Sequence, residues 1–180
     1  MRIAIVSVLT AAGLAACASQ PPDWIMRPTA EGGWAATECV KDSGNLSLDR
    51  QIAVAKARAE IAKQVELRVA AMDKTYTRLT EEANQNVANA QPTTGESRAF
   101  QTAFESVSKQ IAEQTLGGLS PARVEYVELN DARNLCAMIA VDRSAARSVY
   151  DQVVSASGQK LSPAQSETLY KDFTGAGGTN

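Results

Sequence analysis

The chain contains one long helical pattern, which begins at Leu48 and continues to about Val87. Apolar or small side chains recur in it at intervals of three and four residues, at Leu48, Ile52, Ala55, Ala59, Ala62, Val65, Val69, Met72, Tyr76 and Leu79. Side chains with this spacing share one face of an α-helix, so the pattern predicts a buried stripe along a single helix. A helix over residues 48–88 would be ~60 Å long, which is more than a compact domain of this size needs. Part of the helical hairpin that this helix forms with the next one is therefore expected to project from the domain.

A second helix is predicted after a break at Pro92. Thr93 and Glu96 have the spacing of a capping box, and Gly117 and Gly118 provide a stop signal. The apolar positions between them are Phe100, Phe104, Val107 and Ile111. Because the connection between the two helices is short, we expect an antiparallel helical hairpin at about 48–116.

Charged side chains predict the outer surface of the long helix. Lys56 lies four residues before Glu60, a spacing that brings opposite charges together on a solvated face. Arg58, Arg68 and Arg78 recur along the same helix and are also interpreted as solvated. Contact with an anionic partner is the alternative for these three arginines.

Three short segments have the composition of β-strands. The first runs from Trp34 to Val40, between a glycine pair and the turn-forming residues 41–44. The other two, 123–129 and 135–141, are separated by the polar segment 130–134 and predict a β-hairpin. The last of the three strands is apolar on both faces, which favours a central position in the sheet.

Two further helices are predicted near the C-terminus. Asp142 can cap the first, and Ser162 with Gln165 has the form of a capping box for the second. Their apolar positions are Ala146, Val149, Tyr150 and Val153, and then Leu169 and Phe173. The order β-α-(α)-β-β-α-α predicts an α+β fold, in which a small antiparallel sheet with a β-α-β-β core packs on helices and a long helical hairpin is inserted.

The predicted organisation has four parts. They are a signal peptide at 1–16, a tether at 17–33, the α+β domain at 34–157 and a short helix with a disordered tail at 158–180. The tether contains three of the six prolines and a glycine pair, which favours irregular structure. Trp24 and Ile25 suggest that part of it docks on the domain.

Cys17 follows a segment with the features of a bacterial lipoprotein signal peptide. One cation, Arg2, precedes the apolar stretch 3–14, which is shorter than the ~20 residues that a membrane-spanning helix needs. Residues 14–17, Leu-Ala-Ala-Cys, resemble the lipobox, in which the thiol is acylated and the chain is cut before the cysteine. Two or three acyl chains on Cys17 would hold the protein firmly on a membrane. The alternative is an ordinary signal peptide followed by an unmodified cysteine.

The residue after Cys17 bears on the location of the protein. Ala18 at this position resembles the pattern that sorts lipoproteins to the outer membrane. We therefore expect an outer-membrane protein whose domain faces the periplasm, with inner-membrane retention and surface exposure as alternatives. The other cysteines, Cys39 and Cys136, form a candidate disulfide in such an oxidising compartment. Two separate buried thiols are equally compatible with the sequence.

The composition argues against enzymatic chemistry and nucleic-acid binding. The chain has no His, which removes the commonest general base and most zinc sites. Its 18 Lys and Arg are balanced by 20 Asp and Glu without a basic run, so no nucleic-acid partner is expected. Ser106 and Ser157 each precede a Lys by three residues, as in penicillin-binding enzymes, but the Lys-Thr-Gly element of those enzymes is absent. We expect a protein that is not an enzyme, with no catalytic residue, no cofactor and no metal site.

Several of these features occur together in one known family. They are Cys17, the segment Pro-Asp-Trp-Ile at 22–25, the region of Gly33, Asp49-Arg50 with the Ala-rich helix 53–69, and the late strands that end in Ala140-Val141-Asp142. In this combination the chain resembles the LPP-twenty-like family of outer-membrane lipoproteins, which includes flagellar lipoproteins of the FlgP type. The resemblance covers most of residues 17–155.

This resemblance implies a β-α-β-β core, membrane anchoring, and self-association or assembly with envelope partners, and it implies no catalytic residues. The expected function is that of a non-enzymatic outer-membrane lipoprotein, a structural or self-associating component of the cell envelope. Its expected partners are the membrane, through the lipid anchor on Cys17, and periplasmic proteins or further copies of the chain. The alternative is a regulatory lipoprotein that binds an envelope enzyme or peptidoglycan as a monomer.

Overall fold

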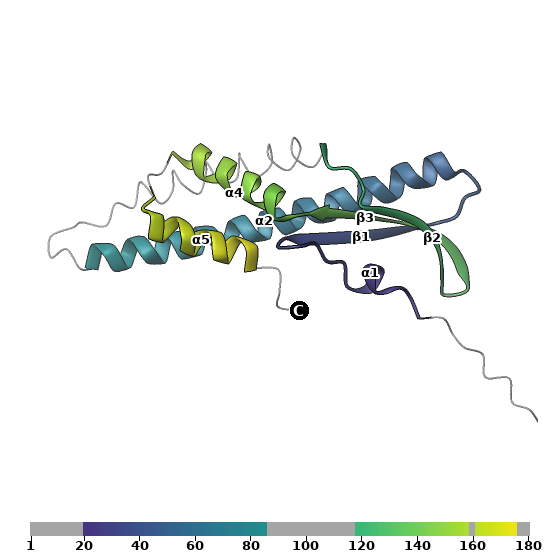
Figure 1. The fold of residues 1–180 in the computed structure, drawn as a ribbon, viewed down its shortest axis with the longest axis horizontal. Helices are drawn as coiled ribbons and strands as arrows, with labels where there is room; N and C mark the ends of the chain where they lie inside the picture. The colour runs from purple at the N-terminus through teal and green to yellow at the C-terminus, as the bar shows by residue number, and fades with distance from the viewer. Residues whose placement is uncertain (1–19, 86–117, 159–160, 176–180) are drawn as a thin grey trace, which may run out of the picture.

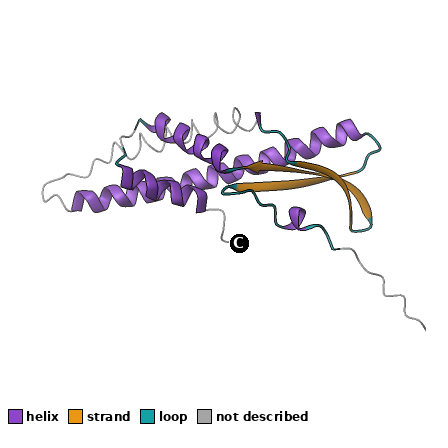
Figure 2. Cartoon of the chain, in the orientation of Figure 1, coloured by secondary structure: helices purple, strands orange, loops and turns teal. Residues whose placement is uncertain are grey.

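The computed structural model describes residues 20–85, 118–158 and 161–175 (Figure 1). Within them the chain folds into four helices and a three-stranded antiparallel sheet (Figure 2), so the predicted α+β fold is confirmed. In chain order the elements are α1 (Asp23–Met26), β1 (Trp34–Lys41), α2 (Leu46–Gln85), β2 (Arg123–Leu129), β3 (Ala132–Val141), α4 (Arg143–Ser157) and α5 (Pro163–Gly175). The predicted signal peptide, Cys17, the second arm of the helical hairpin and the C-terminal tail lie outside the described residues.

β3 occupies the centre of the sheet, between β1 and β2, as its apolar composition predicts. Both neighbouring strands run antiparallel to it, and Trp34 of β1 pairs with Val141 at the end of β3. Leu135, Cys136 and Ala137 follow one another in β3 and are all buried. Because successive side chains of a strand point to opposite faces, β3 is covered on both sides.

The connection between β2 and β3 is shorter than the sequence predicts. β2 ends at Leu129 and β3 begins at Ala132, so Asn130 and Asp131 alone form the turn, and the loop predicted over 130–134 is wrong. Both turn residues have positive φ, of 53° and 58°. Positive φ at both central residues is the requirement of a type I′ turn, which is common in two-residue hairpins, and Asn and Asp tolerate this conformation better than most residues. The remaining residues of the predicted loop extend β3.

α2 is 40 residues long and begins two residues before Leu48. Asn45 caps its start, since its Oδ1 accepts a hydrogen bond from the Leu48 backbone N–H at 3.2 Å. In Figure 1 the helix runs along the length of the molecule, with the sheet beside its first half and α5 beside its second half. The long helix predicted from the sequence is thus present. Among the described helices, none has both the length and the apolar composition needed to cross a membrane.

The buried face of α2 differs from the predicted stripe in the first half of the helix. Leu48 and Ile52 are 47% and 40% exposed, and Ala55 and Ala59 are also exposed. The buried positions there are instead Asp49, Ala53, Ala57, Ile61 and Val65, at a constant spacing of four residues. Four residues turn a helix by about 400°, so each step moves the buried position about 40° around the axis. The contact therefore rotates along the helix, as expected where it crosses a twisted sheet.

From Val65 onward the predicted stripe of α2 is confirmed. Val69 and Met72 are buried, and Tyr76 and Leu79 are partly buried against the same core. This half of α2 packs against α5, which is also a helix. The straight stripe inferred from the sequence fits a helix–helix contact better than it fits a contact between a helix and a twisted sheet.

The core lies between the sheet, α2 and the two C-terminal helices. Its aromatic side chains contact one another: the rings of Trp34 and Phe173 meet edge to face with centroids 5.5 Å apart, and those of Tyr150 and Phe173 are tilted with centroids 5.9 Å apart. All the apolar positions predicted for the two C-terminal helices are buried: Ala146, Val149, Tyr150 and Val153 in α4, and Leu169 and Phe173 in α5. Phe173 is fully buried, so α5 is part of the same packed unit as the sheet.

The predicted caps of α4 and α5 are also confirmed. The Asp142 side chain accepts the Ala145 backbone N–H at 2.8 Å at the start of α4. Ahead of α5, the Ser162 backbone N–H donates to Gln165 Oε1 at 2.9 Å, and the Gln165 N–H donates to Ser162 Oγ at 3.3 Å. These reciprocal bonds form the capping box that the sequence predicts.

Candidate interaction surfaces

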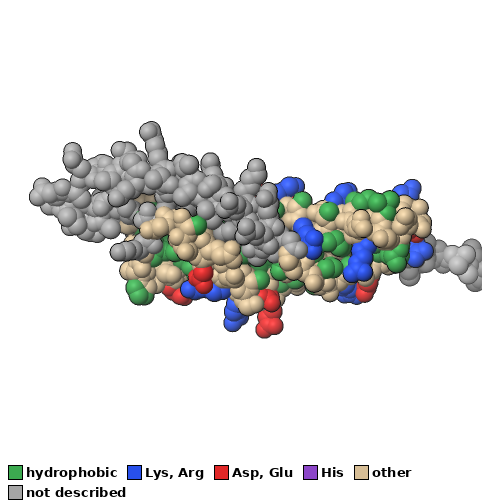
Figure 3. All heavy atoms as spheres, turned by 90° about the horizontal axis from the view of Figure 1, so that it is seen from above, with side chains coloured by type: hydrophobic (Ala, Val, Ile, Leu, Met, Phe, Trp, Pro, Cys, Tyr) green, Lys and Arg blue, Asp and Glu red, His purple; other side chains and the backbone are tan. Residues whose placement is uncertain are grey.

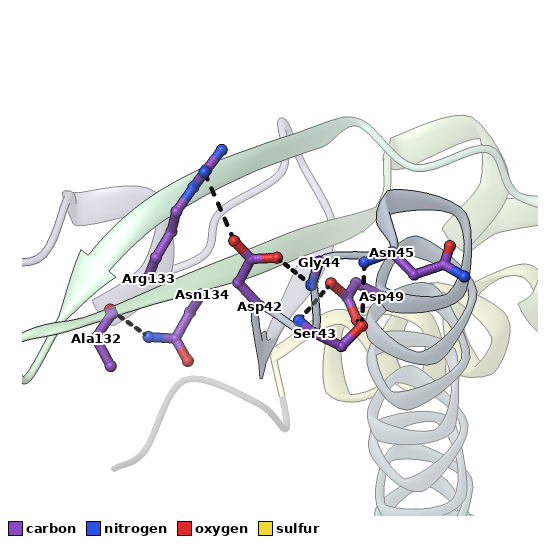
Figure 4. A network of polar contacts seen from close by, with 8 residues as sticks. All are labelled: Asp42, Ser43, Gly44, Asn45, Asp49, Ala132, Arg133 and Asn134. Carbon is purple, nitrogen blue, oxygen red and sulfur yellow. Dashed lines mark hydrogen bonds and ion pairs between the residues drawn. The ribbon is translucent and has the colours of Figure 1, made fainter.

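The connection between β1 and α2 contains a network of polar contacts (Figure 4). Asp49, in the first turn of α2, is 2% exposed and accepts two hydrogen bonds from Ser43, from the hydroxyl at 2.7 Å and from the backbone N–H at 3.0 Å. Both bonds lower the pKa of the Asp49 carboxyl below its ordinary value, and the bond from the Ser43 hydroxyl has the larger effect. The carboxylate therefore ties the chain that leaves β1 to the start of α2.

Asp42 joins the same network to β3 (Figure 4). Its carboxylate accepts the Gly44 backbone N–H at 2.9 Å and lies 3.6 Å from Arg133 Nη1. The guanidinium of Arg133 in turn stacks over the Tyr126 ring of β2, with its central carbon 4.0 Å from the ring centroid. Each of these polar groups has a structural partner, and in the described part of the chain no three His, Cys, Asp or Glu side chains are grouped to hold a metal ion. This network fixes the start of α2 relative to β1 and β3.

The outward side of the first half of α2 carries an exposed apolar row, which we call the α2 stripe: Leu48, Ile52, Ala55 and Ala59. Lys56 lies beside it, and between Leu46 and Ala59 the only carboxylate of the helix is Asp49, which is buried. Figure 3 shows hydrophobic and cationic side chains side by side at this end of the molecule. An exposed apolar row with cationic neighbours is typical of a contact surface.

The two cysteines of the sheet are joined by a disulfide. Cys39 of β1 and Cys136 of β3 are direct register partners, with an S–S distance of 2.04 Å. The bond links the edge strand β1 to the central strand across a sequence separation of 97 residues. The sequence leaves open a disulfide or two separate thiols, and the structure contains the disulfide.

α1 lies on the face of the sheet opposite α2. Along β1, Trp34 and Ala36 point into the core with α2, so Thr37 points to the other face. The Thr37 hydroxyl donates to the Trp24 carbonyl of α1 at 2.8 Å, and the guanidinium of Arg123 lies 4.8 Å from the centroid of the Trp24 ring. The docking of Trp24 that the sequence suggests is thus confirmed.

Arg68 is not part of a solvated face, which corrects the interpretation of the arginines on α2. Its side chain is 3% exposed, and burial lowers its pKa below the ordinary value. Nη1 donates to the carbonyls of Phe173 and Thr174, at 2.8 and 2.7 Å. These carbonyls lie at the C-terminal end of α5, where the helix leaves acceptors free. No pattern on α2 alone could reveal this role, because the partner is more than a hundred residues away in sequence.

The remaining polar side chains of interest either donate to a backbone carbonyl or lie outside the described residues. Arg58 Nη2 donates to the Leu119 carbonyl at 2.8 Å, so this arginine also holds the chain that leads into β2. The Ser157 hydroxyl donates to the Val154 carbonyl at 2.7 Å, and its lysine at 160 lies outside the described residues, as does Ser106. Of the three predicted site residues, the structure brings Cys39 and Cys136 together. The third, Cys17, lies outside the described residues.

Comparison of the chain with protein-family models, with curated proteins and with solved structures finds no match.

Proposed function

We propose that this protein is a non-enzymatic lipoprotein of the outer membrane, anchored by acylated Cys17, whose α+β domain faces the periplasm. In this proposal the domain is a structural component that associates with further copies of itself or with other envelope proteins. The resemblance of the sequence to the LPP-twenty-like family supports this function. So does the order of signal-peptide features that ends at Cys17.

The α2 stripe is the observation that supports the proposed association of the domain with other proteins. Leu48 and Ile52 are nearly half exposed although they lie on a helix whose other face is fully packed. Ala55 and Ala59 continue the row with side chains so small that a partner helix can approach closely. Apolar side chains that are grouped on one surface are stabilised when another protein covers them.

The anchor is tested by replacing the modified residue. A Cys17→Ser variant of the full chain should be released from the membrane fraction of the cell, whereas the unaltered protein should remain in it. Mass spectrometry of the mature protein, purified from membranes, should show a chain that begins at Cys17 and carries a diacylglyceryl group and a further acyl chain on that residue. A variant that stays in the membrane fraction without these groups would contradict the anchor.

Self-association is tested with protein that begins at Ala18, which retains all the described residues. We expect a discrete oligomer in sedimentation velocity, and we expect Leu48→Gln with Ile52→Gln to shift the distribution to monomer. Leu67→Gln is the matched control, because Leu67 is 68% exposed on the same helix but lies outside the α2 stripe. A concentration-independent monomer would contradict self-association and would favour the monomeric regulatory alternative.

A further inference from the structure

The two faces of the sheet are unequal, because α2 covers one and the short α1 covers part of the other. Thr37 on β1 and Arg123 on β2 are both register partners of Met138 on β3. The three side chains therefore form a row across the sheet, on the face away from α2. α1 rests on this row through Trp24, which contacts Thr37 and Arg123. We call α1 and this row the α1 face.

Met26 is the exposed apolar residue of the α1 face. It is 65% exposed, while Trp24 and Ile25 on the same short helix are half-buried. Among the described residues, the other large hydrophobic side chains that are strongly exposed are all on α2: Leu46, Leu48, Ile52 and Leu67. Met26 is thus on α1, which contacts the sheet on the face opposite α2.

The length of chain before α1 limits how far this face can be from Cys17. Asp23, the first residue of α1, follows Cys17 by six residues, which reach at most ~20 Å when fully extended. Pro21 and Pro22 lie within this stretch and restrict its backbone. In Figure 1 the described chain enters on the same side of the sheet as α1, and α2 lies on the other side. A lipid anchor on Cys17 would therefore hold the α1 face near the membrane.

We propose that the α1 face rests on the bilayer, with Met26 among the lipid chains at the membrane surface and the α2 stripe directed away from the membrane. This inference rests on the proposed anchoring of Cys17. A short tether makes the contact intramolecular, with an effective concentration in the millimolar range, so a small apolar contact is enough to keep it formed.

This orientation separates two tasks on one small domain. The α1 face contacts lipid, and the α2 stripe remains accessible to proteins in the periplasm. If the orientation were reversed, the membrane would compete with protein partners for the α2 stripe.

The test uses the mature lipidated protein, which begins at Cys17, in phospholipid vesicles, with an environment-sensitive fluorophore on one introduced cysteine. Met26→Cys reports on the α1 face, Leu48→Cys on the α2 stripe, and Leu67→Cys is a control further along α2. Each introduced thiol is the only free one, because the anchor occupies Cys17 and the disulfide occupies Cys39 and Cys136. All three sites are 47% to 68% exposed, so the labels should not disturb folding.

We expect the label at position 26 to shift its emission to the blue and to brighten severalfold, and to be quenched by lipid-bound quenchers. The labels at positions 48 and 67 should keep the emission of a label in water and should be quenched by iodide. If the protein is anchored and the label at position 26 stays in water, the inference is wrong and the proposed function is unaffected. Entry of the label at position 48 into the bilayer would also overturn it. A protein that does not sediment with vesicles would overturn the anchoring and this inference together.

Discussion

Arg68 on α2 stacks on Trp34 of β1, with its guanidinium carbon 4.1 Å from the centroid of the indole ring. The same guanidinium donates to the Phe173 and Thr174 carbonyls at the end of α5. A single buried side chain therefore connects the sheet, the long helix and the C-terminal helix. Because the interactions come from three elements, loss of this side chain should affect the stability of the whole domain.

We predict that Arg68→Met lowers the free energy of unfolding by on the order of 2 kcal/mol, since it leaves two carbonyls at the end of α5 without their donor. Urea denaturation followed by circular dichroism measures the change. Lys63→Met is the control, because its side chain is 70% exposed. Equal stability of the two variants would mean that water replaces Arg68 at little cost.

The disulfide should make a large contribution to stability. It closes a loop over a sequence separation of 97 residues, for which the chain-entropy model gives about 4–5 kcal/mol. Reduction of the wild-type protein should therefore lower its melting temperature strongly. The double variant Cys39→Ala with Cys136→Ala should melt at a low temperature whether or not a reductant is present. A reductant effect that persists in the double variant would show that the stabilisation has another source.

Gly33 should not tolerate a side chain. A Cβ placed on it would lie 1.9 Å from the Val141 carbonyl oxygen, which belongs to the backbone of β3 and cannot rotate away. Gly33→Ala is expected to cost on the order of 2 kcal/mol through displacement of the β1–β3 pair. Gly118→Ala is the matched control, since a Cβ there meets nothing within 4 Å. Thermal unfolding of both variants measures the difference.

Asp49 should contribute to the pH dependence of the free energy of unfolding. Its pKa in the folded protein is below the ordinary value of 3.8, because Ser43 donates to the charged carboxylate. A lowered folded pKa adds stability above the unfolded pKa, and this stability is lost as the pH falls through the folded value. Stability at neutral pH should thus exceed that at pH ~2–3, and Asp49→Asn should reduce the difference. Denaturant titrations at several pH values measure it, and an unchanged acid dependence in the variant would contradict the assignment.

The sequence predicts those parts of the fold that depend on local patterns. The caps at Asp142 and Ser162 and the central position of β3 follow from residue types and spacing, and the structure has all of them. The stripe on α2 follows from spacing only where the partner is another helix. At Leu48 and Ile52 the prediction fails, because the twist of the sheet, which no residue of α2 encodes, decides which side is buried.

The candidate surfaces were less accessible to sequence reasoning. The exposure of Met26 depends on the docking of Trp24 against Arg123, a contact between segments about one hundred residues apart. The pairing of Cys39 with Cys136 needed their register across two strands, although the even number of remaining cysteines pointed to it. The role of Arg68 required the position of α5. In each case the missing information was the relative placement of distant segments.

The disulfide also determines what happens to this protein when its backbone is cut. All of α2 and β2 lies in the chain between Cys39 and Cys136, so one break anywhere in that loop leaves two pieces that remain covalently joined. One piece carries Cys17 and the other carries α4 and α5. If Cys17 carries the proposed lipid anchor, a nick in this loop would leave both pieces attached to it, and reduction of the disulfide would be needed before the C-terminal piece could leave the membrane.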